Sequence, residues 1–200
     1  RFDGNNFKHF TNIPGDSSSP YAGQPRSIHT DKKGNLWIGY EMGMQQYVYA
    51  PSSFKSIDAL KEHYVFFITS YTDSLLLLGT SRGFIKYNIN TGSAFNYTQS
   101  TLPKFALLNK NNVNECVIQG NTVYMATNNG LFSMNLSTNE IISIPVPILN
   151  NVSLKRIAVD RNNNIWLGTY GTIKLVKLHN DYKKTEVFDR YLSSSFLTNA

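Results

Sequence analysis

The sequence repeats one pattern four times, and this repetition limits the possible folds more than any other feature. Each copy has an apolar run that ends in Gly or Ala, a polar break and a second apolar stretch. The copies are NLWIGYEMGMQQYVY, SLLLLGTSRGFIKYN, TVYMATNNGLFSMN and NIWLGTYGTIKLVKL, with anchors Gly39, Gly79, Ala126 and Gly168 that lie 40, 47 and 42 residues apart. A period of about 40 to 45 residues with four strands per unit is typical of a β-propeller blade.

Within each copy the pattern predicts four strands, A to D. Strand A is a short alternating run such as SIHTD or RIAVD, and a turn rich in Gly, Asn and Asp follows it. Those turn residues tolerate the positive φ that a tight hairpin needs. Helical periodicity is weak except at 57–63, IDALKEH, where one or two helical turns are possible. The sequence therefore predicts an all-β protein made of four-stranded antiparallel blades.

The repeats also predict how the chain is divided. We expect residues 1–25 to be the end of a preceding blade and a linker, followed by blades at 26–65, 66–112 and 113–153. Residues 154–200 are expected to hold a further blade and the start of the next, in SSSFLTNA. Propellers close with about four to eight blades, and an open sheet edge invites pairing. We therefore expect about four blades of a larger, seven-bladed propeller, and homodimerisation of the fragment or its parent.

The first and last copies resemble the two-component regulator propeller repeat. Its pattern is an apolar residue, Asp and Gly in a turn, apolar-Trp-apolar-Gly-Thr, and then Gly, an apolar residue and an aromatic one. The middle copies depart from it, with Leu77 and Tyr124 in place of Trp, and Asn163 or Asn164 replaces the turn glycine in the last copy. The residues that match the repeat's structural anchors are Asp31, Gly34, Trp37, Gly39, Gly79, Asp160, Trp166 and Gly168.

The resemblance implies a function for a parent protein. Such repeats form the periplasmic sensor region of hybrid two-component systems in Bacteroides-type gut bacteria, which are anchored in the inner membrane and carry a histidine kinase. Many of these proteins sense oligosaccharides and switch on transcription of polysaccharide-utilisation genes. The resemblance thus implies a non-catalytic fragment of a sensor, with contact to the membrane only through the parent chain.

Other classes of protein find little support in the sequence. A single cysteine excludes an internal disulfide, and the four histidines lack the spacing of a metal site, so no metal or cofactor is expected. The formal net charge is +6, but the basic residues are scattered, so this segment is not expected to bind nucleic acid. TDKKGNLW resembles the aspartate box of sialidases, yet Asp and Gly serve the hairpin turn equally well.

Any ligand is expected at the end of the blades where the B–C turns and D–A connections meet, since functional residues gather on loops of a rigid scaffold. We predict an oligosaccharide there, stacked on tyrosines and hydrogen-bonded by the polar side chains. The candidates are Tyr40, Glu41, Arg82, Asn128, Asn129 and Tyr170. Trp37 and Trp166 are instead expected in the core between blades. Two alternatives remain: a structural or dimerisation segment without its own ligand, and a sialidase-like or lyase-like enzyme.

Overall fold

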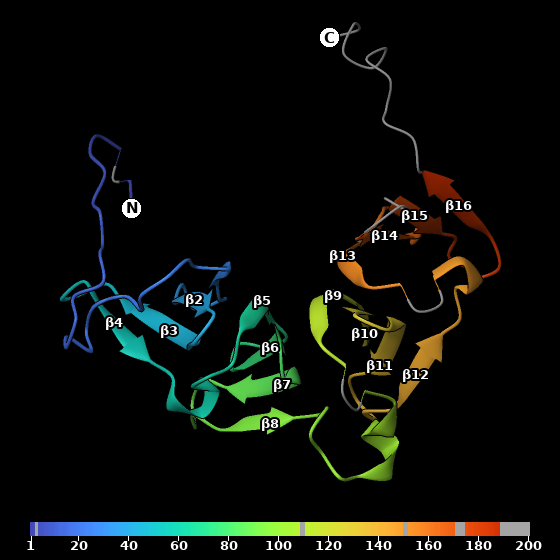
Figure 1. Ribbon diagram of the computed structural model, residues 1–200, viewed down its shortest axis with the longest axis horizontal. Coiled ribbons are helices and arrows are strands. Elements are labelled where there is room, and N and C mark those ends of the chain that lie inside the picture. The colour runs from blue at the N-terminus through green and yellow to red at the C-terminus, as the bar shows by residue number, and fades with distance from the viewer. Residues whose placement is uncertain (3, 109–110, 150–151, 171–174, 189–200) are drawn as a thin grey trace, which may run out of the picture. The chain divides into compact units, whose positions relative to one another are not determined.

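A computed structural model describes residues 1–2, 4–108, 111–149, 152–170 and 175–188. The chain divides into two compact units, Arg1–Ser100 and Thr101–Ala200. Each unit contains two four-stranded antiparallel sheets, whose strands follow one another in chain order (Figure 1). We call the four sheets blades 1 to 4. No helix among the described residues is long and apolar enough to cross a membrane.

The N-terminal unit holds blades 1 and 2, joined by a short 3₁₀ helix, η1 (Asp58–Leu60). Blade 1 has the strand order β1-β2-β3-β4, and blade 2 has the order β5-β6-β7-β8. The bounds of the strands are β1 Ser27–Thr30, β2 Leu36–Tyr40, β3 Gly43–Val48, β4 Ser53–Ser56, β5 Val65–Ser70, β6 Leu75–Thr80, β7 Gly83–Asn88 and β8 Ala94–Asn96.

The C-terminal unit holds blades 3 and 4, with the 3₁₀ helices η2 (Pro103–Leu108) and η3 (Pro147–Leu149) before each of them. The strand orders are again sequential, β9 to β12 and β13 to β16. The bounds of the strands are β9 Val113–Gln119, β10 Thr122–Thr127, β11 Gly130–Asn135, β12 Ile141–Ile144, β13 Leu154–Val159, β14 Ile165–Thr169, β15 Leu175–Leu178 and β16 Thr185–Phe188.

The predicted all-β architecture of four-stranded antiparallel blades is confirmed. The possible helix at 57–63 is a single 3₁₀ turn. At the N-terminus, where part of a preceding blade was expected, Phe2 and Phe7 form an isolated antiparallel bridge. The expected start of a further strand in SSSFLTNA lies outside the described residues.

The anchor glycine of blade 1 is required by close packing between strands. Gly39 pairs with Ser27 of β1 and with Met44 of β3. A Cβ at Gly39 would lie 2.3 Å from Ser27 Oγ and 2.8 Å from Val65 Cγ1, which belongs to blade 2. Only glycine at this position lets β2 approach the first strand of blade 2 this closely.

The core of the N-terminal unit lies between its two sheets. Successive side chains of a strand point to opposite faces, so β2 directs Trp37 at blade 2. Trp37 is 2% exposed and its ring meets Tyr87 edge-on at 6.0 Å. The buried cluster that forms this interface is Trp37, Met44, Ile57, Leu60, Val65, Ile68, Leu76, Leu78, Ile85 and Tyr87. The expected place of Trp37 between blades is therefore observed.

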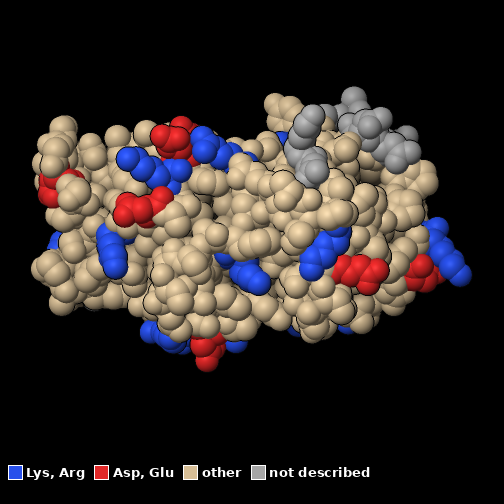
Figure 2. All heavy atoms as spheres, turned by 90° about the horizontal axis from the view of Figure 1, so that it is seen from below, with Lys and Arg blue, Asp and Glu red and all other residues tan. Residues whose placement is uncertain are grey.

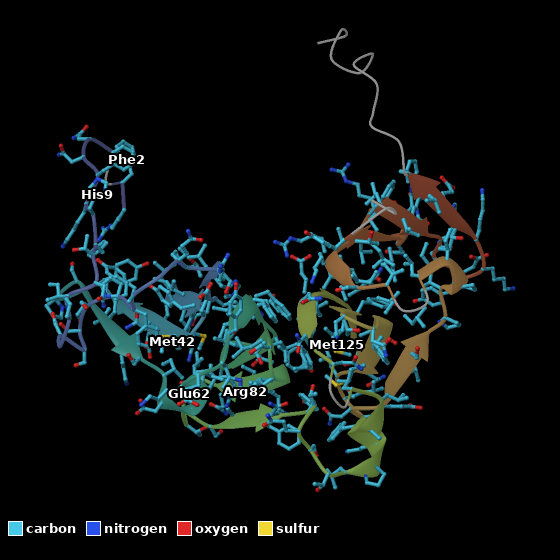
Figure 3. All side chains as sticks on the ribbon, viewed as in Figure 1. Phe2, His9, Met42, Glu62, Arg82 and Met125 are labelled. Atoms are coloured by element: carbon cyan, nitrogen blue, oxygen red, sulfur yellow. The ribbon has the colours of Figure 1, made fainter. Side chains whose placement is uncertain are left out.

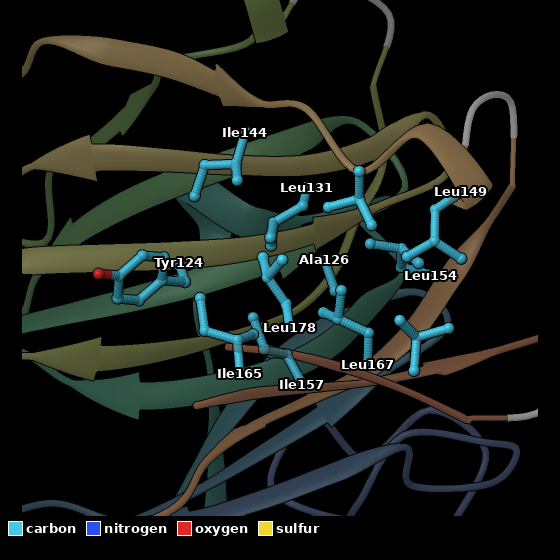
Figure 4. Close-up of a cluster of buried hydrophobic side chains, with 12 residues drawn as sticks. Tyr124, Ala126, Leu131, Ile144, Leu149, Leu154, Ile157, Ile165, Leu167 and Leu178 are labelled. Atoms are coloured by element: carbon cyan, nitrogen blue, oxygen red, sulfur yellow. The ribbon is translucent and has the colours of Figure 1, made fainter. Parts of the chain in front are cut away.

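The core of the C-terminal unit lies between blades 3 and 4 (Figure 4). It is mostly aliphatic, and Ile165 and Leu167 of β14 point into it. Trp166 lies between these two residues and therefore points to the opposite face of blade 4. It is only partly buried, stacks on Phe188 at 5.6 Å and lies under the Lys177 ammonium group. Among the described residues, no second sheet covers Trp166, contrary to the expected position in the core.

Blades 1 and 4 share a hairpin in which a carboxylate binds the tryptophan indole. Asp31 Oδ1 accepts hydrogen bonds from the backbone amides of Lys33 and Asn35, both at 2.9 Å. Asp31 Oδ2 accepts from Asn35 Nδ2 and from Trp37 Nε1, again at 2.9 Å. We call this arrangement the Asp–Trp hairpin. It ties the A–B turn to the side chain at the centre of the blade interface.

The last repeat builds the same hairpin with other turn residues. Asp160 accepts from the amides of Asn162 and Asn164 at 2.9 Å and from the indole of Trp166 at 2.9 Å. Asn163 takes φ of 62°, where blade 1 has Gly34 with φ of 83°. Asparagine tolerates this left-handed conformation better than most residues, so the substitution preserves the turn.

Candidate functional site

The candidate site of the N-terminal unit lies where the B–C turns and D–A connections meet. β2 ends and β3 begins at this end of blade 1, and β6 ends and β7 begins at the same end of blade 2. The connection from β4 to β5 runs along it, residues 57–64. We call this part of the unit the loop end. It brings together residues that are far apart in the sequence.

Two arginine–glutamate pairs dominate the loop end. The Arg26 guanidinium donates through Nε to Glu41 Oε1 at 3.2 Å and also through Nη2. Arg82 Nη2 lies 3.5 Å from Glu62 Oε2, and Figure 3 shows these two side chains beside each other. All four side chains are between 40% and 67% exposed, so their charges face solvent. The pairs therefore present donors and acceptors together without a large local excess of charge.

Tyr64 connects the two pairs. The Arg26 guanidinium lies 5.4 Å from the centre of its ring. The Tyr64 backbone exchanges hydrogen bonds with Ser81, since its amide donates to Ser81 Oγ at 3.3 Å and its carbonyl accepts from Ser81 N at 3.0 Å. Ser81 directly precedes Arg82 in the chain. The half-buried Tyr64 ring thus lies beside the Arg26–Glu41 pair, with the Phe66 ring centre 4.8 Å from its own, and the Tyr64 backbone is bonded to the residue before Arg82.

His63 completes the loop end as a neutral group. Its Nδ1 lies 3.4 Å from Thr80 Oγ1. Burial lowers the pKa of His63, and the positive charge of Arg82 lowers it further, against the opposing effect of Glu62. The imidazole is therefore uncharged at neutral pH and can both donate and accept a hydrogen bond.

Two of the predicted site residues, Glu41 and Arg82, belong to this loop end, whereas Tyr40 does not project from it. Tyr40 is the last residue of β2, is 4% exposed and packs edge-on against Tyr21 at 5.4 Å. Burial, together with Tyr21, raises the pKa of Tyr40 to about 12. Tyr40 was expected in the B–C loop because the break in the repeat was placed directly after Gly39; the strand in fact continues through it.

The other predicted residues lie in the C-terminal unit. Asn128 Oδ1 accepts from the Asn112 amide at 2.8 Å, which fixes the start of blade 3. Asn129 is exposed in the B–C turn of blade 3, and Tyr170 is 81% exposed after β14. Gly171, also part of that expected turn, lies outside the described residues.

Sequence reasoning missed Arg26, Glu62 and Tyr64. Each lies in a D–A connection or at the start of a strand A, where the copies differ most in length. An Arg or Glu in such a segment carries no local signal, because most charged loop residues simply face water. The contacts form between residues that are 15 positions apart in Arg26–Glu41 and 20 positions apart in Glu62–Arg82, so only the folded structure reveals them.

A cavity of about 750 Å³ lies in this unit over the outer face of blade 1, which is the face turned away from blade 2. It is lined by aromatic residues of that face and of the N-terminal segment, among them Phe10, Tyr21 and Tyr47. Ile38 and Tyr47 hold the same register positions in blade 1 that Leu78 and Tyr87 hold in blade 2. Because the blade 2 pair packs on blade 1, the cavity marks a face suited to packing another blade.

The charges of the described surface are mixed. Figure 2 shows Lys and Arg close to Asp and Glu on the face that it presents, with most of the surface formed by other residues. Among the described residues, no group of three or more His, Cys, Asp or Glu side chains is arranged to hold a metal ion.

Four sequential, four-stranded antiparallel blades define a β-propeller segment. Residues 147–171 match the family model described as two component regulator propeller. This match covers the start of the last repeat, including its Asp–Trp hairpin, and it confirms the resemblance inferred from the sequence. No curated protein sequence matches the chain.

Solved structures share the fold over most of the chain. The extracellular domain assigned to a hybrid two-component system of B. thetaiotaomicron has a TM-score of 0.71 and 17% identity, covering 92% of this chain and 24% of that one. The corresponding domain of a second such system from the same organism has a TM-score of 0.71 and 21% identity, covering 90% and 24%. This chain thus spans about a quarter of the length of these extracellular domains.

An enzyme also shares the fold. Virginiamycin B lyase from Staphylococcus aureus, in a catalytically inactive form with quinupristin, has a TM-score of 0.64 and 14% identity, covering 91% of this chain and 59% of that one. At these identities the likeness describes the fold alone.

Proposed function

We propose that this chain is part of the extracytoplasmic sensor region of a hybrid two-component histidine kinase. In this proposal it lies in the periplasm, and its parent is anchored in the inner membrane and controls transcription of polysaccharide-utilisation genes. The match of residues 147–171 to the two-component regulator propeller model carries the proposal. The fold likeness to extracellular domains of B. thetaiotaomicron two-component systems supports it. The segment itself is non-catalytic in this proposal.

The ligand in this proposal is an oligosaccharide that binds at the loop end of the N-terminal unit. Sugars present many hydroxyl groups that donate and accept hydrogen bonds, and they stack on aromatic rings. The loop end offers both kinds of contact, through the Arg26–Glu41 and Glu62–Arg82 pairs and through Tyr64. Since each arginine is paired with a glutamate, the site favours an uncharged sugar over a polyanion.

Calorimetric titration of the purified protein with a panel of oligosaccharides tests this proposal. The double variant Arg26→Gln/Arg82→Gln is expected to weaken binding at least tenfold, because charged hydrogen bonds contribute about 1.5–3 kcal/mol each. The matched control is Lys32→Gln, which breaks an exposed pair with Asp73, at 3.6 Å, at the opposite end of the same blades. Equal binding by the double variant and the control would place the ligand elsewhere.

A second candidate function is self-association. On the outer face of blade 1, Ile38 and Tyr47 lie where Leu78 and Tyr87 of blade 2 contact the Trp37 face of blade 1. The outer face of blade 4 presents Trp166, which is held by an Asp–Trp hairpin as Trp37 is. The interface between blades 1 and 2, in which the Trp37 face of blade 1 packs on the corresponding face of blade 2, supports such a pairing. A second copy of the chain can therefore supply the partner, head to tail, in a homodimer.

A further inference from the structure

Strand A contains a β-bulge at the same place in blades 2, 3 and 4, close to the B–C turns. In blade 2 the register with β6 shifts between Val65 and Phe67, so Phe66 is an extra residue that has no counterpart in β6 (β5 and β6 are labelled in Figure 1). The corresponding extra residues are Asn114 in blade 3 and Lys155 in blade 4. Bulges redirect side chains and are common next to active sites, so these positions are candidates for contact with a ligand.

The bulge in blade 2 moves Phe66 out of the interface between blades 1 and 2. Val65 and Ile68 both belong to the buried cluster of this interface, although an odd number of positions separates them. In a regular strand, alternate residues share a face, so Phe66 would lie beside Ile68 in that cluster. The bulge gives this place to Val65, which is 0% exposed, and leaves Phe66 only half-buried at the loop end.

The other blades show that the fold does not require an apolar side chain at this position. The position lies directly before the strand A residue that pairs with the anchor, and in blade 1 the exposed Arg26 occupies it. Lys155 is exposed there in blade 4, and in blade 3 the buried Asn114 donates to the Leu154 carbonyl at 2.6 Å. Single exposed apolar residues are common on proteins. Here, however, polar residues serve the same backbone position in the other blades, so the packing of the strands does not explain the choice of Phe66.

The Phe66 ring is held next to the polar groups of the loop end. Its centre lies 4.8 Å from that of the Tyr64 ring, and the two ring planes meet at 47°. The same Tyr64 ring has its centre 5.4 Å from the Arg26 guanidinium, which donates to Glu41. One tyrosine thus contacts both an apolar ring and a charged hydrogen-bonding pair. Because Tyr64 already orders the Phe66 ring, contact between this ring and a ligand costs little side-chain entropy.

From this geometry we propose that Phe66 is a further ligand-contacting residue of the loop end, and that its ring packs against the C–H groups of a sugar unit whose hydroxyl groups bind Arg26 and Glu41. A pyranose ring carries its hydroxyl groups around its edge and exposes C–H groups on its faces. Burial of these C–H groups against an aromatic ring is favourable through the hydrophobic effect and dispersion. This inference rests on the proposed function of oligosaccharide sensing and adds the residue that supplies an apolar contact.

Calorimetric titration with the neutral tetrasaccharides of β-linked glucose, xylose, mannose and galactose tests this role. The unmodified protein is expected to bind at least one of them. Phe66→Leu, which keeps an apolar side chain but removes the ring, is expected to weaken that binding about fivefold, and Phe66→Lys at least about tenfold. Phe66→Trp keeps an aromatic face and should retain binding.

Urea denaturation separates this role from a structural one. Phe66→Lys is expected to unfold at nearly the same urea concentration as the unmodified protein, because Arg26 and Lys155 occupy the same position in blades 1 and 4. The matched control is Phe95→Lys. Phe95 lies in β8, at the opposite edge of blade 2 from β5, and packs on Tyr97 at 4.9 Å as Phe66 packs on its own tyrosine neighbour. The control should bind these sugars normally.

Unchanged binding by Phe66→Leu and Phe66→Lys would overturn this role and leave oligosaccharide binding at the loop end intact. Loss of binding by the control as well as by Phe66→Lys, or a large fall in the stability of Phe66→Lys, would assign Phe66 to the fold and also overturn it. Binding of none of the four sugars by the unmodified protein would overturn the oligosaccharide site together with this inference.

Discussion

In each Asp–Trp hairpin, one aspartate binds both the backbone amides of a turn and the indole of a tryptophan. The turn role of Asp31 and Asp160 could be predicted from the sequence, because Asp before a Gly or Asn turn commonly caps backbone amides. The bond to the indole could not be predicted, since it depends on the rotamer of a side chain six residues away. The same carboxylate thus fixes the turn and orients the ring.

Replacement of Asp31 by Ala is expected to destabilise the protein by about 2–4 kcal/mol, because it leaves the buried Trp37 N–H and two turn amides without their acceptor. The corresponding change Asp160→Ala should cost less, because Trp166 is partly exposed and water can replace the carboxylate. Urea denaturation followed by circular dichroism measures both. A cost of Asp160→Ala equal to or above that of Asp31→Ala would contradict this account.

The Asp31 carboxylate also makes the stability of the fold depend on pH. Burial alone would raise the pKa of Asp31, but hydrogen bonds from Asn35, Trp37 and the turn amides outweigh it and lower the pKa below its usual range. A lowered pKa in the folded state means that the ionised form contributes stability above the unfolded pKa of about 3.9. This contribution is lost as the pH falls through the lower folded value.

We therefore expect the free energy of unfolding to fall below about pH 4, and to fall less steeply in Asp31→Asn. Asparagine keeps an acceptor oxygen but cannot titrate. Denaturant titrations at a series of pH values between neutral and strongly acidic provide the measurement. Parallel pH profiles for the two proteins would show that Asp31 is not responsible.

At the scale of elements, the repeat predicted the strands well and the loops poorly. Alternating apolar residues and polar turns determine the strands locally, so the sixteen strands expected for the four blades are all present. The candidate site depends instead on contacts between connections, such as that of Arg26 with Glu41 and Tyr64. No pattern within a single repeat encodes such a contact.

Gly83 and Gly130 begin strand C of blades 2 and 3 with φ of 112° and 102°, and they form a matched pair for separating the effect of packing from that of backbone strain. Gly83→Ala and Gly130→Ala both place a Cβ at positive φ, but only the first also meets a side chain, that of Thr98. Gly83→Ala is expected to be more destabilising than Gly130→Ala by about 1–3 kcal/mol, the usual cost of overpacking. Chemical denaturation of the two variants gives the difference, and a value near zero would show that Thr98 moves aside freely.

At the scale of the whole molecule, the two outer faces predict how copies associate. Ile28 is 68% exposed and lines the cavity over the outer face of blade 1. If that face receives a second copy, Ile28→Lys is expected to weaken dimerisation at least tenfold by burying a charge. Ile142→Lys, at a site 52% exposed in blade 3, is the control.

Sedimentation velocity over a range of concentrations measures this association. The unmodified protein and the control are expected to form a dimer as the concentration rises. Ile28→Lys should remain monomeric up to a higher concentration. A monomer at every concentration would exclude the head-to-tail contact, and equal association of all three proteins would exclude this face.

The Asp–Trp hairpins also give the protein a pair of optical reporters. The chain has only two tryptophans, and one lies in each compact unit, Trp37 in the first and Trp166 in the second. Their surroundings differ, since Trp37 is enclosed between sheets and Trp166 lies beneath a lysine at the surface. Fluorescence of Trp166→Phe should therefore be blue-shifted relative to that of Trp37→Phe. Each half of the chain can be followed separately, without an added dye, as a sugar or denaturant is titrated.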